Sequence, residues 1–488
     1  MAKQETAETL DPANWDAMRA LGHRAVDDAF DWLQTLRERP VWKPTPDAVL
    51  AQLRRPLPRG PEGAEKAYAD FVDLVLPYPM GNVHPRFWVW YMGNGTPLGA
   101  IGDFLAAIVN PNMAGGNHVA NHVESQVLDW CKEIVGLPIE SGGLLVSGGS
   151  AANLIGLNVA RNCATSVDVR ALGVRALPAA LAFYTSVEAH SSMQKALELL
   201  GLGAGSLRKV PVHADYRIDV DSLERMIAAD RAAGLLPACV IGNAGTINTG
   251  AVDDLAALAA VCKRQDLWFH VDGAIGAVVA LAPRRRGLVA GIEQADSVAL
   301  DLHKWLHVPF EAGCVLVRDR GAQRAAFSLT PEYLEHAARG LASGSIWFSE
   351  FGPQLSRSFR ALKVWMSFKE HGLDKFGRLI DQNIDQAHAL AAQVAARPEL
   401  EVMAPVVLNI VCFRYRCPGL DLAAANVFNQ ELLVRLHESG IAAPSYTTLD
   451  GRYCLRAAIA NHRTQPRDLA MLVDAVVGIG NALAAEKA

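Results

Sequence analysis

The chain has 488 residues and a formal net charge of −5, with 51% hydrophobic and 20% charged residues, a composition typical of a globular protein large enough for two or three structural layers. The mild charge and the lack of a basic stripe argue against a nucleic-acid partner, and without a signal peptide or a run of about 18 apolar residues we expect no membrane span. The eight cysteines form no C-x-x-C pair, which favours buried, reduced thiols in a cytoplasmic protein.

The predicted elements fall into three regions along the chain. Residues 1–83 are predicted to form helices joined by a connection rich in proline and arginine, a segment that we expect to wrap around a partner. In residues 84–380, apolar strands alternate with helices, which is typical of a mainly parallel sheet with helices on both faces. Residues 381–488 are predicted to form a smaller α+β domain.

The ends of the predicted strands carry polar residues, and ligands of open α/β sheets bind beyond these ends. In "VSGGSAANL" (146–154), Gly149 and Ser150 stand at a predicted helix start, where free backbone N–H groups can hold a phosphate. An ordinary helix cap at Ser150 is the alternative, and the motif lacks the Gly-Lys-Ser/Thr of a Walker A loop.

Three further side chains follow predicted strands. His190 comes after "FYTSVEA", where a purely structural histidine is the alternative. Asp272 ends the apolar strand of "WFHVDGA" and needs a cationic partner, because an unpaired buried carboxylate is costly. Lys304, in "DLHKWLHVP" (301–309), lies in an apolar neighbourhood; such a lysine either extends to water or has a lowered pKa that makes its amine a nucleophile.

These features together match one cofactor. Pyridoxal phosphate (PLP) needs a lysine for its Schiff base, an acidic partner for its pyridinium nitrogen and an anion site. Lys304, Asp272 and the segment around Gly149 supply these groups, His190 can stack on the ring, and Ala274 is small enough to let a flat ring approach.

The order of motifs resembles the group II PLP-dependent amino-acid decarboxylases, which include the aromatic-L-amino-acid decarboxylases. The likeness covers most of the chain and includes "HPRFWVWY" (84–91), "ESQVLDW" (124–130), "SGGSAANL", "AHSS", "GTINTGAVDD" (245–254), "HVDGA", "HKW", "TPEYLEH" (330–336) and "NHRT" (461–464). The resemblance implies the aspartate-aminotransferase-like fold (PLP fold type I), with a seven-stranded sheet, and a homodimer with active sites at the interface.

The resemblance also assigns roles to individual residues. Lys304 would form the Schiff base, Asp272 would pair with the pyridine nitrogen, and His190 and Ala274 would pack on the two faces of the ring. The other cofactor-binding positions implied are Gly149, Ser150, Thr246 and His303. Tyr333 matches the family's mobile-loop tyrosine, which protonates Cα after CO2 leaves; an ordinary surface tyrosine is the alternative.

Two departures from the family pattern stand out. Asp301-Leu302 replaces the frequent Asn-Pro before the His-Lys pair, and an acidic side chain near a phosphate needs a compensating charge or water. The segment "NHVANHVE" (117–124) differs from the family where that region shapes the substrate pocket. His118 and His122 are spaced as metal ligands on a helix, but without H-E-x-x-H we favour a changed substrate pocket and expect no metal.

The substrate is open at this stage. Phe87, Trp88, Trp90 and Tyr91 fall where aromatic-amino-acid members line the pocket, and Trp90 is the best candidate; the alternative is that all four are core residues. We therefore expect decarboxylation of an L-amino acid, leaning toward an aromatic one, to the amine and CO2. The alternatives are aldehyde synthesis, which is associated with Phe at the position of Tyr333, a non-aromatic substrate and, least favoured, a non-enzymatic interaction protein.

Overall fold

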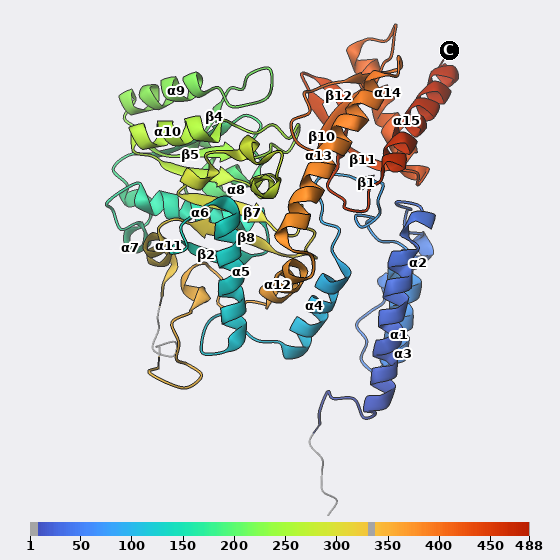
Figure 1. The fold of residues 1–488 in the computed structure, drawn as a ribbon, viewed down its shortest axis with the longest axis horizontal. Helices are drawn as coiled ribbons and strands as arrows, with labels where there is room; N and C mark the ends of the chain where they lie inside the picture. Colours follow the sequence, from blue (N-terminus) through green and yellow to red (C-terminus); the bar gives the residue numbers. More distant parts are fainter. Residues whose placement is uncertain (1–7, 330–336, 488) are drawn as a thin grey trace, which may run out of the picture.

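The computed structural model describes residues 8–329 and 337–487, and its larger sheet has seven strands in the order β2-β8-β7-β6-β5-β3-β4 (Figure 1). Their bounds are β2 (Gly142–Val146), β3 (Leu181–Ser186), β4 (Leu207–Val210), β5 (Leu236–Asn243), β6 (Trp268–Asp272), β7 (Ser297–Asp301) and β8 (Gly313–Val317). Strand β8 is antiparallel to β2 and to β7, and the other pairs are parallel. The prediction of a mainly parallel α/β sheet is confirmed; the direction of β8 was not predictable, because periodicity carries no information on strand direction.

Helices cover both faces of this sheet. On one face, α6 (Gly149–Cys163) and α8 (Ser192–Leu199) pack on the strands, with Leu157 and Met193 in one core cluster with Cys239. On the opposite face lie α5 (Val119–Val135) and α10 (Leu255–Gln265). The other helices of this part of the chain are α4 (Pro97–Val109), α7 (Val169–Leu172), α9 (Val220–Ala232), α11 (Arg320–Phe327) and α12 (Arg360–His371). Each fully buried aliphatic side chain contributes roughly 1.5–3 kcal/mol to stability.

A second sheet of five strands, in the order β1-β11-β12-β10-β9, forms the C-terminal part of the structure. Its elements are β1 (Phe87–Trp88), β9 (Leu400–Val402), β10 (Ile410–Tyr415), β11 (Ala443–Leu449) and β12 (Arg452–Ala458), with helices α13 (Leu373–Ala395), α14 (Leu422–Glu438) and α15 (Pro466–Lys487). Strand β1 pairs in parallel with β11, although the sequence analysis places residues 84–91 in the region 84–380 and not in the C-terminal domain. A two-residue strand distant in sequence from its partner leaves no pattern that reveals this pairing.

Helix α15 bears on the expectation of no membrane span. Among the described residues, its segment Pro466–Glu486 has the length and the mean hydropathy, 1.6, of a spanning helix, which the sequence analysis overlooked. Leu472 and Val476 are, however, fully buried in the core cluster of the C-terminal part. The apolar composition of α15 is thus accounted for by packing against the smaller sheet.

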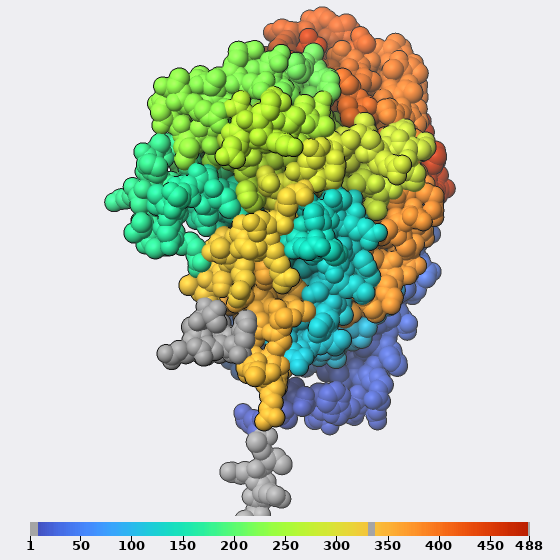
Figure 2. Space-filling view, turned by 60° about the vertical axis from the view of Figure 1, so that its left-hand side comes forward, coloured from blue at the N-terminus to red at the C-terminus, as the bar shows by residue number. Residues whose placement is uncertain are grey.

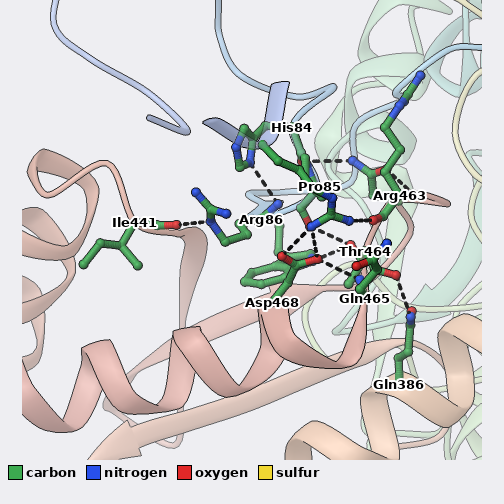
Figure 3. A network of polar contacts seen from close by, with 12 residues as sticks. His84, Pro85, Arg86, Gln386, Ile441, Arg463, Thr464, Gln465 and Asp468 are labelled. Atoms are coloured by element: carbon green, nitrogen blue, oxygen red, sulfur yellow. Dashed lines mark hydrogen bonds and ion pairs between the residues drawn. The ribbon is translucent and has the colours of Figure 1, made fainter. Parts of the chain in front are cut away.

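Polar contacts attach the segment around residue 85 to the C-terminal part (Figure 3). The Thr464 hydroxyl donates to the Pro85 carbonyl at 2.7 Å, and Nε of Arg86 donates to the Ile441 carbonyl at 2.6 Å. Nε2 of Gln386, on α13, donates to the Thr464 carbonyl at 2.9 Å. The same helix contacts the connection between β7 and β8, because the Trp305 indole donates to Asn383 at 2.9 Å, and the Asn383 amide donates to Gln386 at 2.9 Å.

The N-terminal helices α1 (Trp15–Gln34), α2 (Asp47–Leu53) and α3 (Ala64–Asp70) form an arm that extends past one edge of the body (Figures 1 and 2). No residue of α1 or α3 is buried. Arg37, just after α1, anchors the arm through an ion pair with Asp468 at 2.8 Å. The expectation that residues 1–83 wrap around a partner stays a prediction.

A fully buried ion pair connects α5 to the segment that precedes α12. Glu124 and Arg357 are paired with both side chains 0% exposed. Nη1 of Arg357 also donates to the Met113 carbonyl and Nη2 to the Leu145 carbonyl, each at 2.8 Å. The backbone N–H of Leu145, on β2, donates to Glu124 at 3.3 Å. This network therefore fixes the edge of the larger sheet.

We expect Arg357→Met to lower the free energy of unfolding by roughly 3–5 kcal/mol, because Glu124 would be left buried without a cation. Equilibrium urea unfolding measures the change. Arg264→Met is the matched control: Arg264 pairs with Glu224 at 2.7 Å with side chains 57% and 38% exposed, and an exposed pair is worth up to about 1 kcal/mol. Equal losses in the two variants would contradict the role assigned to the buried pair.

Candidate active site

A cavity of about 510 Å³ opens at the carboxyl ends of the central parallel strands. Eleven of the residues singled out from the sequence line it, namely Trp90, Tyr91, Gly149, Ser150, His190, Thr246, Asp272, Ala274, Asp301, His303 and Lys304. They come from segments spread over more than 200 positions, and the sheet brings them together because its parallel strands all end at this edge.

Lys304 lies in the turn after β7 and does not extend freely to water. Its Nζ is 2.9 Å from Oδ2 of Asp301, and the Lys304 side chain is only 21% exposed. The neighbouring Trp305, Leu306 and Leu302 are fully buried. The ammonium in this apolar neighbourhood is thus held by a carboxylate three residues earlier.

Asp272, the last residue of β6, is a buried carboxylate beside this lysine. Burial raises the pKa of Asp272 and the charge of Lys304 opposes the rise. One oxygen of Asp272 accepts the backbone N–H of Ala274 at 3.2 Å. Lys304 therefore acts on Asp272 through its charge, while its ammonium is paired with Asp301.

His190 lies on the wall of the cavity at the start of α8. Its Nδ1 is 2.8 Å from the Ser192 hydroxyl, which orients the ring. Desolvation lowers the pKa of His190, whereas the nearby Asp272 raises it. The imidazole is therefore neutral near pH 7, in the form suited to packing on an aromatic ring.

The start of α6 has the features expected of an anion site. The helix begins at Gly149 and its N-cap is Gly148, with no capping side chain, so the alternative of a cap by Ser150 is wrong. Gly149 is required by close packing, because a Cβ there would lie 3.0 Å from the Ala274 Cβ and 3.0 Å from Oδ2 of Asp301. The first backbone N–H groups of α6 thus face a cavity from which larger side chains are excluded.

Thr246 and His303 complete the predicted set. The buried Thr246 hydroxyl is 3.1 Å from the Thr249 hydroxyl. The ring of His303 packs against Phe310 with centroids 4.3 Å apart, and its Nδ1 accepts the backbone N–H of Ala312 at 3.1 Å. Burial lowers the pKa of His303.

The aromatic segment around Trp90 differs from an alternating strand. Strand β1 ends at Trp88, and Trp90 has a φ of 49°, so the alternation of side chains stops. Phe87, Trp88 and Tyr91 are buried, whereas Trp90 is 54% exposed and lines the cavity together with Tyr91. The alternative that all four are core residues is wrong for Trp90.

Two other predicted residues, His118 and His122, lie apart from this cavity. His118, the N-cap of α5, and the exposed His122 do not line it. Among the described residues, no group of three or more histidines, cysteines or acidic residues could hold a metal. Tyr333 lies outside the described residues. The roles predicted for these three side chains stay predictions.

Sequence reasoning missed several residues that line the cavity. Asn243 ends β5, and the strand-end rule that found Asp272 could have found it. Asn153 lies on the second turn of α6, where a helix gives no sign of a ligand. Phe310 and Glu311 reach the cavity from the connection between β7 and β8, and no local pattern in the sequence places them there.

The fold and the site define a PLP-dependent enzyme of fold type I. Residues 46–416 match the family model described as the pyridoxal-dependent decarboxylase conserved domain. An aromatic-L-amino-acid decarboxylase of Bacillus atrophaeus is 35% identical over 466 residues, covering 94% of each chain. A phenylacetaldehyde synthase of Arabidopsis thaliana is 29% identical over 475 residues, covering 95% of each chain. The crystal structure of Oryza sativa TDC with PLP and tryptamine has a TM-score of 0.89 at 26% identity, covering 97% of this chain and 99% of that chain.

The chain belongs to the pyridoxal-dependent decarboxylase family; it is an amino-acid decarboxylase, and its cofactor is PLP. The residues of the cavity fit this group. A buried carboxylate beside a lysine, an uncapped helix start and a close approach that only glycine permits are the features that a ring nitrogen, an aldehyde and a phosphate require.

Below the cavity, His270 supports the base of α6. Its ring nitrogens lie 2.7 Å from the Ser297 hydroxyl and 2.9 Å from the Asn153 side-chain oxygen. The residue is fully buried, and burial lowers the pKa of His270 to about 3. The folded protein therefore keeps this ring neutral at pH values where the unfolded chain protonates it.

We expect the free energy of unfolding to fall by about 2 kcal/mol between pH 7 and pH 5 through His270 alone, because the unfolded chain takes up a proton that the folded protein does not. Thermal or urea unfolding at both pH values measures the loss in the wild type and in His270→Gln. The variant should lose less stability over this interval. Parallel pH profiles would show that His270 does not contribute.

Proposed function

We propose that this enzyme converts an aromatic L-amino acid to its amine and CO2, with Lys304 as the residue that holds PLP. The observation that carries the proposal is the cavity in which Lys304, Asp272 and His190 meet the uncapped start of α6. These residue types in one site supply covalent attachment, a partner for the ring nitrogen, a stacking surface and an anion site.

The bound cofactor supplies a protonated ring that accepts the electrons left when CO2 departs. Asp272 holds the proton on the ring nitrogen. Its carboxylate is buried, and a protonated ring nitrogen would compensate its charge. His190 and Ala274 confine the ring between two faces. Gly149 and Ser150 offer N–H groups to the phosphate, and Thr246 and His303 close the polar side of the site.

Trp90 supports the lean toward an aromatic substrate. Its carbonyl accepts Nη1 of the buried Arg456 at 3.0 Å, so the backbone is fixed while the ring stays accessible. Phe310 is 48% exposed and also lines the cavity. Two accessible aromatic rings at one cavity suit an aromatic side chain. Since His118 and His122 do not line this cavity, any role in a substrate pocket requires the cavity of a second chain.

The proposal predicts that the purified enzyme, supplied with PLP and a panel of L-amino acids, releases amine and CO2 in equal amounts without peroxide, with an aromatic substrate giving the highest kcat/KM. Tyr333→Phe is expected to shift the product toward aldehyde and peroxide. Quantifying amine, aldehyde, CO2 and peroxide together checks both statements.

Controls separate the residue roles from the reaction. Lys304→Ala should lose at least about 1,000-fold in kcat, because it removes the covalent anchor, and the surface variant Lys195→Ala should keep wild-type rates. Aldehyde with peroxide from the wild type would instead favour an aldehyde synthase. A preference for acidic or aliphatic substrates would overturn the aromatic assignment.

We further propose a cytoplasmic homodimer. All eight cysteines are free thiols and six of them are buried, which suits a reducing compartment. Helix α4 exposes an apolar face with Phe104 61% and Ile108 68% exposed. These residues stand four apart on one side of the helix. A second copy is the occupant that an exposed apolar face of this size favours.

We expect sedimentation equilibrium to give twice the chain mass of 52.5 kDa. The double variant Phe104→Asp/Ile108→Asp should shift the protein toward one chain mass at low micromolar concentration, because charges would be buried at the interface. Leu199→Asp is the control, since Leu199 is 76% exposed on α8, away from this face. A wild type of single-chain mass would overturn the dimer.

A further inference from the structure

A second cavity, of about 310 Å³, lies beside β2, the edge strand of the larger sheet. It is bounded by β2, by α5, by the first residue of α11 and by the segment 345–351, and it shares no lining residue with the active-site cavity. Its volume is at the lower end of the range for small-molecule sites, about 300–1,000 Å³. The cavity is thus large enough for a small molecule and separate from the site described above.

Arg320 is the cation of this second cavity that lacks a compensating charge. The described lining residues with a formal charge are Arg320, Lys132 and Asp129. Lys132 is paired with Asp129 at 2.9 Å, and its Nζ also donates to the Ile139 carbonyl at 2.9 Å. Arg320 has no ion-pair partner among the described residues, and its guanidinium lies over the ring of Phe351, with Cζ 5.3 Å from the ring centroid. A guanidinium stacked in this way keeps N–H groups available in the fork geometry that binds a carboxylate.

Two further hydrogen-bond donors belong to the same cavity. Ser141 is 2% exposed, and its Oγ has no hydrogen-bond partner in the part of the chain that the structure describes. The backbone N–H and C=O of Leu145 point away from β8, to the buried ion pair described above. Gly143, two residues earlier on β2, has the same orientation, so its N–H is not used by the sheet. Arg320 lies close to these donors, because a Cβ built on Gly142 would be 3.2 Å from the Arg320 Cα.

The remaining wall of this cavity is apolar. Leu128, Trp347 and Phe348 are buried side chains that line it, and Ile139, which is 56% exposed, lines it as well. Covering such side chains with an apolar ligand is favourable, because it removes apolar surface from water. The cavity therefore combines a cation and two donors with an apolar wall, a combination that suits an organic anion better than an inorganic one.

We propose that this cavity binds a small organic carboxylate with an apolar body, such as an arylacetate. Arg320 binds the carboxylate, to which the Ser141 hydroxyl and the Gly143 N–H also donate. Leu128 and Trp347 pack on the apolar body. A ligand whose only charge is an ammonium is disfavoured, since it would face the uncompensated guanidinium. The inference does not depend on the proposed activity, because the two cavities share no residue.

Methyl NMR of the enzyme loaded with PLP reports on the two cavities separately in one sample. Ile139 and Ile346 line the proposed site, whereas Ile247 and Ile275 line the active-site cavity. Titration with phenylacetate should shift the δ1-methyl signals of Ile139 and Ile346 along one saturating curve. Shifts confined to Ile247 and Ile275 would place the probe in the active site and overturn the proposal, as would the absence of any shift.

Comparisons of probes and variants test the chemistry of the site. On the wild type, phenylacetamide, which lacks the charge, and acetate, which lacks the ring, should each bind at least about 10-fold more weakly than phenylacetate. Arg320→Met should weaken phenylacetate binding by a similar factor, because it removes charge-assisted hydrogen bonds. Arg225→Met, on a side chain of α9 that is 70% exposed, should match the wild type. Equal affinity for the amide or for Arg320→Met would overturn the role of Arg320, and equal affinity for acetate would overturn the apolar body.

Discussion

The ion pair between Lys304 and Asp301 is the contact around which the site is organised. Both residues lie at the end of β7, in a protein interior where a single buried charge would be costly. The pair stabilises an amine at the carboxyl edge of a sheet whose core is apolar. This amine lines the same cavity as Asp272 and the start of α6. Gly149 packs closely against Asp301, His303 lies 3.9 Å from the same carboxylate, and His190 lines the same cavity.

The sequence predicted the larger sheet and most of the cavity because both depend on local patterns. One apolar run ends at Asp272, and another is followed within a few residues by His303 and Lys304. Each such stretch therefore indicates both a strand and a candidate site residue. Interactions between segments that are distant in the sequence leave no such local pattern. The pairing of β1 with β11, the contact between Glu124 and Arg357, and the approach of Phe310 to His303 depend on the assembled fold.

Two points where the sequence left or suggested another interpretation have specific physical causes. A helix cap at Ser150 was the alternative to a phosphate site, but the N-cap of α6 is Gly148 and the helix begins at Gly149, which leaves N–H groups free for a ligand. Helix α15 was passed over as a spanning candidate because Asp474 interrupts its apolar run, although its mean hydropathy reaches that of a spanning helix; a helix buried against a small sheet can have the same composition as one in lipid. In both cases the tertiary environment decides between two readings of the same residues.

The hydrogen bonds that lead from Trp305 through Asn383 and Gln386 to Thr464 have a mechanical consequence. They run along α13, so the residue next to Lys304 is connected through this helix to the segment that precedes α15. A rotation of the C-terminal part about the larger sheet would have to break these bonds or move Trp305 with it. The turn that carries Lys304 and the C-terminal part are therefore expected to move as one rigid unit.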